Sequence, residues 1–284
     1  MPAERYADLH LHTRWSDGTL YLKEAVRRAH SAGYDCVAIT DHDTIGPELT
    51  TPIQVLEGAE VITGVEIKAD ILGHRGEVLA YFVDPFSPKL RELIDHIAQA
   101  RIERMKEMIS LCNLSLGLRL DYESVAHLTD GSVGRPHLAA ALVEAGAARS
   151  NEEAFQRFLS RGAPCYVPLP RPGFPEVVSA VRAAGGVAAL AHPAFLPIED
   201  WQASLAELQD MGMDGLEVYY PYETGRAPLY ISSAELAAFA EALGLIPTGG
   251  SDDHGPDSVN DSLGSVRVPY GVVERLAGAA SSVT

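Results

Sequence analysis

The sequence predicts an α/β barrel that carries a helical insertion, and three observations support this fold class. Strand and helix patterns alternate from the N-terminus, stop around Asp84-Pro85, and resume after about residue 165. The interval between these points is helical in pattern. Polar residues follow several buried strands where they end, at the face on which α/β barrels assemble their sites. We therefore expect a barrel of residues 1–84 and 166–284 with an insertion of residues 85–165, and 284 residues are enough for both.

The N-terminal part repeats the strand and helix units that build a parallel sheet. Apolar and polar residues alternate from Tyr6 to Leu11, as they do in a half-buried strand. Short apolar runs bounded by turn residues mark the strands that follow. The elements expected here are a strand at 6–11, a helix at about 21–32, a strand at 35–40 and a strand pair near 60–66 and 77–83.

The insertion begins with a long amphipathic helix from Ser87 to about Leu116. Its apolar residues fall on one stripe, which comprises Leu90, Leu93, Ile94, Ile97, Met105, Met108 and Ile109. Further helical patterns follow without a strand, at 121–129, 136–145 and 152–160. Proline and glycine residues between Pro164 and Gly173 mark the exit from this helical region.

Alternation of strands and helices then resumes and completes the barrel. The elements expected in this part are a helix at 175–184, a strand at 187–191, a helix at 200–211, a strand at 215–220, a helix at 233–243, a strand at 245–248, a closing strand near 264–268 and a helix near 270–279.

The composition is typical of a soluble enzyme, and we expect it in the cytoplasm. The formal net charge of -17 disfavours attraction to duplex DNA. No apolar stretch approaches the roughly 20 residues that cross a bilayer, and no signal peptide pattern opens the chain. Cys36, Cys112 and Cys165 are widely spaced, so we assign them to packing rather than to disulfides or zinc. The sequence identifies no protein partner.

Histidines and acids close short hydrophobic runs along the chain. His10 and His12 alternate along the first strand, so both imidazoles leave one face and can chelate one ion. This pair alone is a weak signal, because two strand histidines can also donate hydrogen bonds inside a core. The full set would be costly to bury without a compensating cation. The sequence therefore predicts a multi-metal hydrolase centred on His10, His12, Asp17, His42, Glu66, His192, Asp252 and His254.

Four motifs, in their order along the chain, resemble those of the polymerase and histidinol phosphatase family, or PHP family. They are Asp8-Leu9-His10-Leu11-His12 with Ser16-Asp17-Gly18, Ile39-Thr40-Asp41-His42-Asp43, Ala191-His192-Pro193 and Gly250-Ser251-Asp252-Asp253-His254. The resemblance covers nearly the whole chain. It implies a distorted seven-stranded β/α barrel whose C-terminal face holds up to three divalent ions.

The same resemblance implies how the ligands are shared among a trinuclear set of ions. The residues that look like the ligands of the first ion are His10, His12, Glu66 and Asp252. Those that look like the ligands of the third ion are Asp17, His42 and His254. The second ion takes Glu66, which bridges to the first, together with His192 and a further imidazole that we place at His137 in the insertion.

Glu77 is where this sequence departs from the family pattern. Many relatives carry a ligand-like histidine in the strand that here includes Glu77. Glu77 is a replacement oxygen ligand, a solvent-facing strand residue or a sign of altered metal preference, and we favour the strand residue. The departure puts the second ion in question.

The ligand types favour manganese, zinc or iron, because the set combines imidazole and carboxylate without thiolate. The family resemblance favours manganese, with magnesium as another option, and implies two or three ions. Such ions activate water for attack on a phosphoester and neutralise phosphoryl oxygens. His192 or His254 would then deliver a proton to the leaving oxygen, if it is not fully committed to metal.

The insertion resembles that of one subgroup of the family, small-molecule phosphoesterases that remove the 3'-phosphate from nucleoside 3',5'-bisphosphates. Some members of this subgroup also degrade short RNA from the 5' end. Arg101 and Arg104 share one helix face, and guanidinium groups suit bidentate phosphate binding. Gly134 and Arg135 precede His137, so Arg135 would bridge metals and substrate. A solvated helix face is the alternative interpretation of these arginines.

The leading hypothesis is a metal-dependent phosphatase acting on a small nucleotide with two phosphates. Aromatic candidates for stacking its base are Tyr166, Phe195, Tyr219, Tyr220 and Tyr222, although aromatic residues more often belong to a core. One alternative is a phosphatase for histidinol phosphate or another small phosphomonoester. An alternative of another class is a noncatalytic metal-binding regulatory module.

Overall fold

The computed structural model describes residues 4–127, 133–224 and 227–281, which form two compact units. The first unit contains residues 1–94 and 171–284, and the second contains Asp95–Pro170. Each unit has its own hydrophobic core. Among the described residues, no helix is both long and apolar enough to span a membrane.

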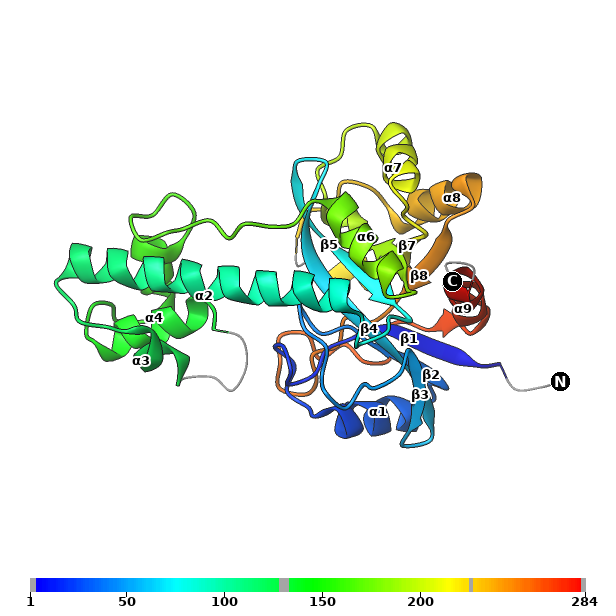
Figure 1. The fold of residues 1–284 in the computed structure, drawn as a ribbon, viewed down its shortest axis with the longest axis horizontal. Coiled ribbons are helices and arrows are strands. Elements are labelled where there is room, and N and C mark those ends of the chain that lie inside the picture. Colours follow the sequence, from blue (N-terminus) through cyan, green and yellow to red (C-terminus); the bar gives the residue numbers. More distant parts are fainter. Residues whose placement is uncertain (1–3, 128–132, 225–226, 282–284) are drawn as a thin grey trace. The chain divides into compact units, whose positions relative to one another are not determined.

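The first unit is a mixed sheet flanked by helices (Figure 1). Its strands are β1 (Tyr6–Leu11), β2 (Cys36–Ile39), β3 (Ile53–Leu56), β4 (Ala59–Ile71), β5 (His74–Tyr81), β6 (Val187–Leu190), β7 (Gly215–Tyr219), β8 (Ile246–Gly249) and β9 (Val268–Pro269). Its helices are α1 (Leu22–Ser31), α6 (Phe174–Ala183), α7 (Trp201–Asp210), α8 (Ser233–Leu243) and α9 (Gly271–Ser281). The predicted order of strands and helices is confirmed except for β3, which was not expected, and the closing strand has only two residues.

Seven strands form the ring of a nearly closed barrel. Neighbouring strands run in the order β8-β7-β6-β5-β4-β2-β1, while β9 pairs with β1 and β3 pairs with β4. The segment after β8 returns to β1, because Leu11 pairs in parallel with Asp253 and the N–H of His12 donates to the Asp253 carbonyl oxygen at 2.9 Å. The expected distorted seven-stranded barrel is thus confirmed.

The distortion comes from β5, which is antiparallel to both of its neighbours, β4 and β6. A two-residue turn at Leu72-Gly73 joins β4 to β5, and both turn residues have positive φ, as the tightest hairpin turns require. Glu66 therefore lies in the middle of a long strand. The expectation that its strand ends at residue 66 is wrong, because the hairpin extends the pairing to Ile71.

The barrel core fills the ring and is closed by α9. Leu9, Ile62 and Leu79 from three strands pack in one cluster with Val272 and Leu276 of α9. An irregularity in β1 between Asp8 and Leu11 interrupts the pairing with β2, and Leu11 joins a different cluster, with residues of α1. Such irregularities redirect side chains, and here Leu9 lies in the barrel core whereas Leu11 lies in the cluster with α1.

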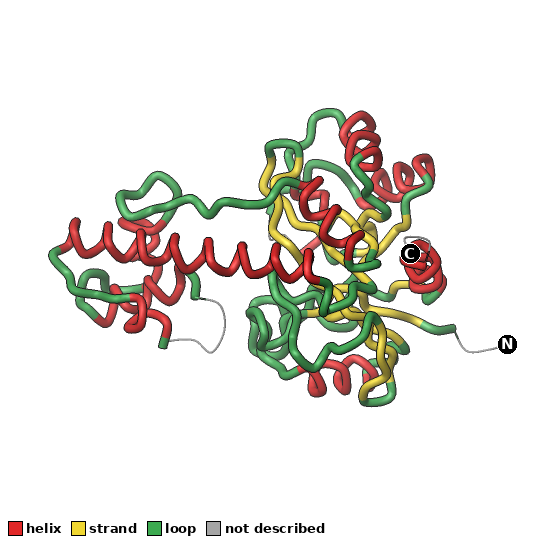
Figure 2. The backbone as a smooth tube through the Cα atoms, in the orientation of Figure 1, coloured by secondary structure: helices red, strands yellow, loops and turns green. Residues whose placement is uncertain are grey.

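The second unit is helical. Figure 2 shows helices and loops, without strands, over its described residues. Its elements are most of α2 (Pro88–Leu116), α3 (Tyr122–Ala126), α4 (Arg135–Glu144), α5 (Asn151–Ala154) and a π-helical turn at Phe155–Leu159. Residues 128–129 of the helix predicted at 121–129 lie outside the described residues. Cys112 and Cys165 are buried in this unit and Cys36 in the barrel, so their assignment to packing is confirmed.

Gly250, in the segment after β8, packs directly against β1. A Cβ atom there would overlap the backbone nitrogen and Cβ of His10 and would sit 2.8 Å from Oδ1 of Asp8. Gly250→Ala should lower the free energy of unfolding by about 1–3 kcal/mol, as overpacking does. Gly278→Ala in α9 is the matched control, because nothing lies within 4 Å of its added Cβ. Equal melting temperatures for the two variants would contradict this packing.

Candidate metal centre

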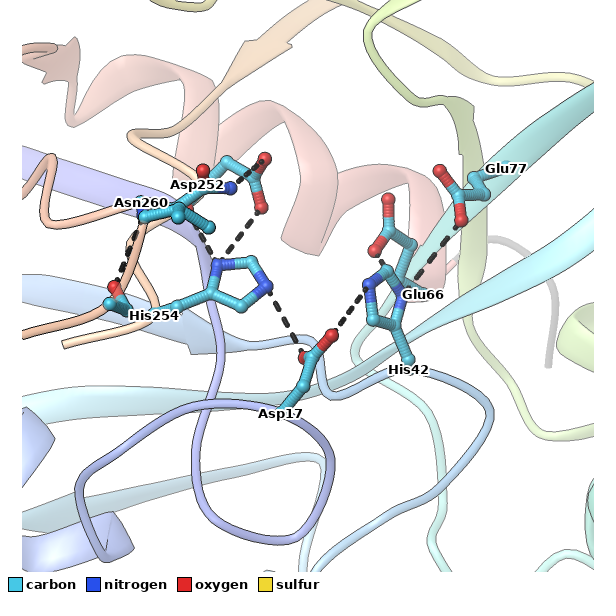
Figure 3. Close-up of a pocket in the computed structure, with 9 residues that line it drawn as sticks. Asp17, His42, Glu66, Glu77, Asp252, His254 and Asn260 are labelled. Carbon is cyan, nitrogen blue, oxygen red and sulfur yellow. Dashed lines mark hydrogen bonds and ion pairs between the residues drawn. The ribbon is translucent and has the colours of Figure 1, made fainter. Parts of the chain in front are cut away.

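A dense group of histidines and carboxylates gathers at one end of the barrel (Figure 3). The residues arrive from five parts of the chain that are distant in sequence. They are His10, His12 and Asp17 from β1 and the loop after it, His42 from the loop after β2, Glu66 and Glu77 from the β4–β5 hairpin, His192 from the loop after β6, and Asp252 and His254 from the loop after β8. The structure thus brings together all the predicted site residues that lie in the barrel.

Glu66 lies at the middle of this group, and its side chain is 1% exposed. Its Oε1 lies 3.5 Å from Nε2 of His10 and 2.9 Å from Nε2 of His192. Its Oε2 lies 3.5 Å from Nε2 of His12 and 2.7 Å from Nδ1 of His42. One carboxylate therefore contacts four imidazoles with its two oxygens, as a bridging ligand would.

Asp17 and Asp252 form further close contacts with the histidines of this group. Oδ1 of Asp17 is 3.2 Å from Nε2 of His254, and its Oδ2 is 3.7 Å from Nε2 of His42. Oδ1 of Asp252 is 3.2 Å from Nε2 of His12 and 3.5 Å from Nε2 of His10. Potential ligand atoms form three groups within 4.8 Å of one another, namely His12, Asp17, His42 and His254; His10, His12 and Glu66; and His42, Glu66 and Glu77.

Several atoms of this group are buried without a hydrogen-bond partner. They are Nε2 of His10, Nε2 of His12, Nδ1 of His42 and Oε2 of Glu66. An unsatisfied buried polar atom costs about 1–3 kcal/mol, so a cluster of them needs compensation. Divalent cations supply it, because imidazole nitrogens and carboxylate oxygens are their ordinary ligands. The residues present therefore fit metal ions.

Hydrogen bonds to the ring nitrogens that face away from the centre orient the imidazoles. Nδ1 of His10 donates to Oε1 of Glu217 at 2.9 Å, which leaves its Nε2 facing the centre. Oε2 of the same carboxylate accepts from the backbone N–H of His192 at 2.6 Å. Nδ1 of His254 donates to the Asp252 carbonyl oxygen at 2.9 Å, so its Nε2 is the nitrogen that faces Asp17 and the centre. These are the tautomers that metal binding requires.

The other acids of the motifs support loops and do not face the centre as ligands. Asp41 accepts three hydrogen bonds of 2.7 Å, from the backbone N–H and hydroxyl of Thr13 and from the hydroxyl of Ser16. Asp8 accepts from the N–H and hydroxyl of Ser251 at 2.9 and 2.6 Å. These bonds fix the loops that carry the candidate ligands.

Two candidate ligands have strained backbone. His192 has φ 27° and Asp252 has φ 56°, in a region that residues other than glycine seldom adopt. Strain of this kind costs roughly 1–3 kcal/mol and persists only where the surroundings enforce it. The hydrogen bond from the N–H of His192 to Glu217 is one such restraint.

Glu77 faces the centre, so the favoured interpretation as a solvent-facing strand residue is wrong. Its Oε2 lies 3.2 Å from Nε2 of His192, and its Oε1 lies 3.9 Å from Nδ1 of His42. The cause is the direction of β5. Because this strand is antiparallel to its neighbours, residues near its start, rather than its end, reach the end of the barrel where the other candidate ligands lie.

The charges in the centre favour cation binding. Burial opposes ionisation of Glu66, yet His42 and His10 hold the pKa of its carboxyl well below the ordinary value. Burial likewise opposes a charged His42, but the Glu66 carboxylate raises the pKa of this imidazole to about 9. The carboxylates therefore stay ionised. In the absence of metal, the raised pKa values of His10, His42 and His192 let these imidazoles hold protons that balance the negative charge, whereas burial lowers the pKa of His12.

A cavity of about 400 Å³ opens onto the centre. It is lined by Asp17, His42, Glu66, Glu77, Asp252, His254, Ser258, Val259 and Asn260. Tyr220 donates its hydroxyl to Oδ2 of Asp252 at 2.9 Å, and its ring lies 5.6 Å from that of His192 and 5.9 Å from that of Phe195. Of the two adjacent tyrosines, Tyr220 is thus the one that faces the centre.

The predicted residues of the insertion lie in the second unit. Arg104 and Arg135 both place their guanidinium carbon 5.8 Å from the centre of the Tyr166 ring. Nε of Arg104 donates to the Val167 carbonyl oxygen, and Nη1 of Arg135 donates to that of Leu159. The structure therefore brings these two arginines together around one aromatic ring, which their sequence separation does not indicate.

Two of the other insertion residues, Gly134 and His137, contact each other. Gly134 precedes α4 as its N-cap, and its N–H donates to Nδ1 of His137 at 2.9 Å. Arg101 lies one turn before Arg104 on α2. The roles of Arg101, Gly134 and His137 toward metal or substrate stay predictions.

Sequence reasoning missed Glu217, Tyr220 as a partner of Asp252, and Asn260. An acid inside the apolar strand Gly215–Tyr219 was a signal for Glu217, because a fully buried carboxylate needs partners. Asn260, which contacts Asp252 through its side-chain amide at 3.4 Å, lies in a loop and carries no such signal.

Comparison with known proteins agrees with this geometry. A family model described as PHP domain matches residues 8–157, more than half of the chain. A protein from Haemophilus influenzae named 5'-3' exoribonuclease is 32% identical over 252 residues, covering 88% of this chain and 90% of that protein. A protein from Chromobacterium violaceum named 3',5'-nucleoside bisphosphate phosphatase is 28% identical over 269 residues, covering 90% of each.

A solved structure shares the fold over nearly the full length. The crystal structure of an inferred metal-dependent phosphoesterase from Bifidobacterium adolescentis superposes with a TM-score of 0.76 at 29% identity. The match covers 98% of both chains.

Proposed function

We propose that this chain, which belongs to the PHP domain family and is a metal-dependent phosphoester hydrolase, removes the 3'-phosphate of nucleoside 3',5'-bisphosphates. We extend the proposal to short RNA, taken from its 5' end. The observation that carries the proposal is the group of buried imidazole and carboxylate atoms without hydrogen-bond partners, which gathers beside a cavity that His42 and Glu66 line. The names of the two relatives support the class of substrate.

One reaction describes both substrates. Water attacks the phosphorus attached to the 3' oxygen, the bond between phosphorus and that oxygen breaks, and the 3' oxygen takes a proton. A bisphosphate then gives a nucleoside 5'-monophosphate and inorganic phosphate. RNA that carries a 5'-phosphate gives the same kind of nucleotide and a chain shortened by one residue, which again bears a 5'-phosphate. A single site for this bond therefore accounts for a phosphatase and an exoribonuclease among the relatives.

The residues of the centre have distinct parts in this proposal. His10, His12, Asp17, His42, Glu66, His192, Asp252 and His254 would hold two or three divalent ions, manganese foremost. When bound, the ions lower the pKa of water and neutralise phosphoryl oxygens. Glu217 holds the imidazole of His10 and the backbone of His192 in place. His192 or His254, whichever is not fully committed to metal, supplies the proton for the leaving oxygen.

The cluster of Arg104, Arg135 and Tyr166 in the second unit would hold the 5'-phosphate, which is not hydrolysed. Two guanidinium groups beside one aromatic ring provide charge-assisted donors and a stacking surface. Arg101 and Gly134 belong to the same proposal, whereas His137 is proposed as a further ligand of the second ion. The support for the phosphate site is the geometry within this unit.

Substrate profiling tests the proposal. With manganese present, kcat/KM for adenosine 3',5'-bisphosphate should exceed that for histidinol phosphate and for 4-nitrophenyl phosphate by about 100-fold, the worth of two charge-assisted contacts. Comparable rates for all three compounds would overturn the nucleotide assignment. The phosphatase for a small phosphomonoester would then be the better description. A protein without turnover on any of them would fit the noncatalytic module.

Arg135→Gln should raise the KM for adenosine 3',5'-bisphosphate by about 10-fold, because a charged donor to phosphate is lost. The rate on 4-nitrophenyl phosphate, which has no second phosphate, should stay within a factor of about 3 by the same reasoning. Arg149→Gln is the matched control, since Arg149 is exposed in the same unit. Equal losses on both substrates would show that Arg135 acts on stability rather than on phosphate binding.

A further inference from the structure

We propose that Glu77 is a metal ligand in this protein, and that Lys68 compensates its charge. The pair replaces one neutral imidazole by a carboxylate and its counter-ion. This inference rests on the metal-dependent function of the site, but it does not depend on which phosphoester is cleaved.

The position of Glu77 is the first argument. Its carboxylate lines the cavity and belongs to a group with His42 and Glu66 whose ligand atoms all lie within 4.8 Å of one another. Figure 3 shows Glu77 and Glu66 extending from neighbouring strands toward His42. Its Oε2 also lies 3.2 Å from Nε2 of His192. Glu77 thus stands between two imidazoles and beside the carboxylate that the geometry marks as the bridge.

Unpartnered atoms point to an ion at this place. Oε2 of Glu66 is buried without a hydrogen-bond partner, in a side chain that is 1% exposed. Nδ1 of His42 lies 2.7 Å from that oxygen, but it is buried and without a hydrogen-bond partner as well. A cation between these two atoms and Glu77 would satisfy all three groups.

Lys68 supplies the compensating charge. Lys68 and Glu77 are register partners across the β4–β5 hairpin, which places their side chains on one face, and Nζ lies 3.3 Å from Oε1 of Glu77. The ammonium group of Lys68 therefore lies where it can offset the negative charge of the Glu77 carboxylate, while Oε2 of the same carboxylate faces His192.

The exchange of nitrogen for oxygen has a consequence for metal choice. Carboxylate oxygens suit manganese and magnesium, whereas imidazole suits zinc. Glu77 should thus shift the preference of this chain toward the harder ions. Restoring a histidine should shift the preference back.

Metal binding without substrate tests the inference. Metal-free wild type, Glu77→Gln, Glu77→His and Lys68→Met would be dialysed against graded concentrations of manganese or zinc, and bound metal would be counted by mass spectrometry. Asp70→Asn is the matched control, because Asp70 lies on the same hairpin but outside the cavity lining.

We expect Glu77→Gln to bind manganese about 10- to 100-fold more weakly at one of its sites, or to lose one ion per chain. Glu77→His should keep the full ion count and favour zinc over manganese by about 10-fold more than wild type does. Lys68→Met should bind manganese more tightly, since an unneutralised carboxylate attracts cations more strongly. If the Lys68–Glu77 pair had only a structural role, Lys68→Met would leave the metal affinity unchanged.

Wild-type manganese count and affinity in both Glu77→Gln and Glu77→His would overturn the inference. This outcome is distinguishable from failure of the nucleotide proposal. A wrong substrate changes the rate profile of wild type and leaves its metal binding untouched, whereas a wrong role for Glu77 leaves the rate profile untouched.

Discussion

Glu66→Gln should abolish the ordered metal centre and lower kcat/KM by about 1,000-fold or more, because the activation of water and the stabilisation of transferring phosphoryl oxygens both depend on the ions. The carboxylate contacts His10, His12, His42 and His192 with two oxygens. A glutamine of the same size puts an N–H donor among these imidazoles and removes the negative charge. Metal analysis and steady-state kinetics on one preparation measure the effect.

The control for Glu66→Gln is again Asp70→Asn, which removes a charge from the same strand outside the cavity lining. It should leave the ion count and turnover unchanged. If Glu66→Gln kept its ions and lost less than about 10-fold in rate, Glu66 would not be the bridge that its geometry indicates.

Glu217→Gln should weaken metal binding by about 10- to 100-fold, the usual cost of losing a partner that orients a ligand. The carboxylate is fully buried, and each of its oxygens accepts one hydrogen bond, from Nδ1 of His10 and from the N–H of His192. A glutamine has only one acceptor oxygen, so one of these two bonds is lost. Titration of metal-free protein with manganese measures the change.

Glu217→Gln should lower the affinity for manganese without removing the metal ligands, so excess manganese should rescue this variant. Saturating manganese should restore most of its turnover, whereas it should not restore Glu66→Gln. Glu207→Gln, at an exposed position of α7, is the matched control and should behave as wild type. Loss of turnover in Glu217→Gln at unchanged manganese affinity would contradict a role in positioning His10 and His192.

The fold was predictable because the barrel is built from local patterns. Apolar runs gave the strands, amphipathic stretches gave the helices, and the interruption after Asp84-Pro85 marked the start of the helical region. The direction of β5 was not predictable, because a strand has the same apolar pattern whether it is parallel or antiparallel to its neighbours. The error at Glu77 follows from this single unknown.

The candidate site was predictable where ligand types occur in short motifs, as at His10 and His12 or at Asp252 and His254. The role of Glu217 was not predictable, because it depends on which residues face this side chain in the folded barrel. The spacing of residues along the sequence does not indicate the register between distant strands. The convergence of Arg104 and Arg135 on Tyr166 is a similar case. These residues come from three separate segments, and only the packing of the unit brings them together.

Metal content measured alongside turnover is the most direct test of the account. Protein stripped of metal by a chelator would be titrated with manganese, with bound ions counted and hydrolysis of adenosine 3',5'-bisphosphate followed on the same samples. The account predicts no turnover without metal, and a rate that rises with occupancy until at least two ions are bound per chain. Full turnover by protein that holds no divalent ion, or binding that saturates without any hydrolysis, would contradict it.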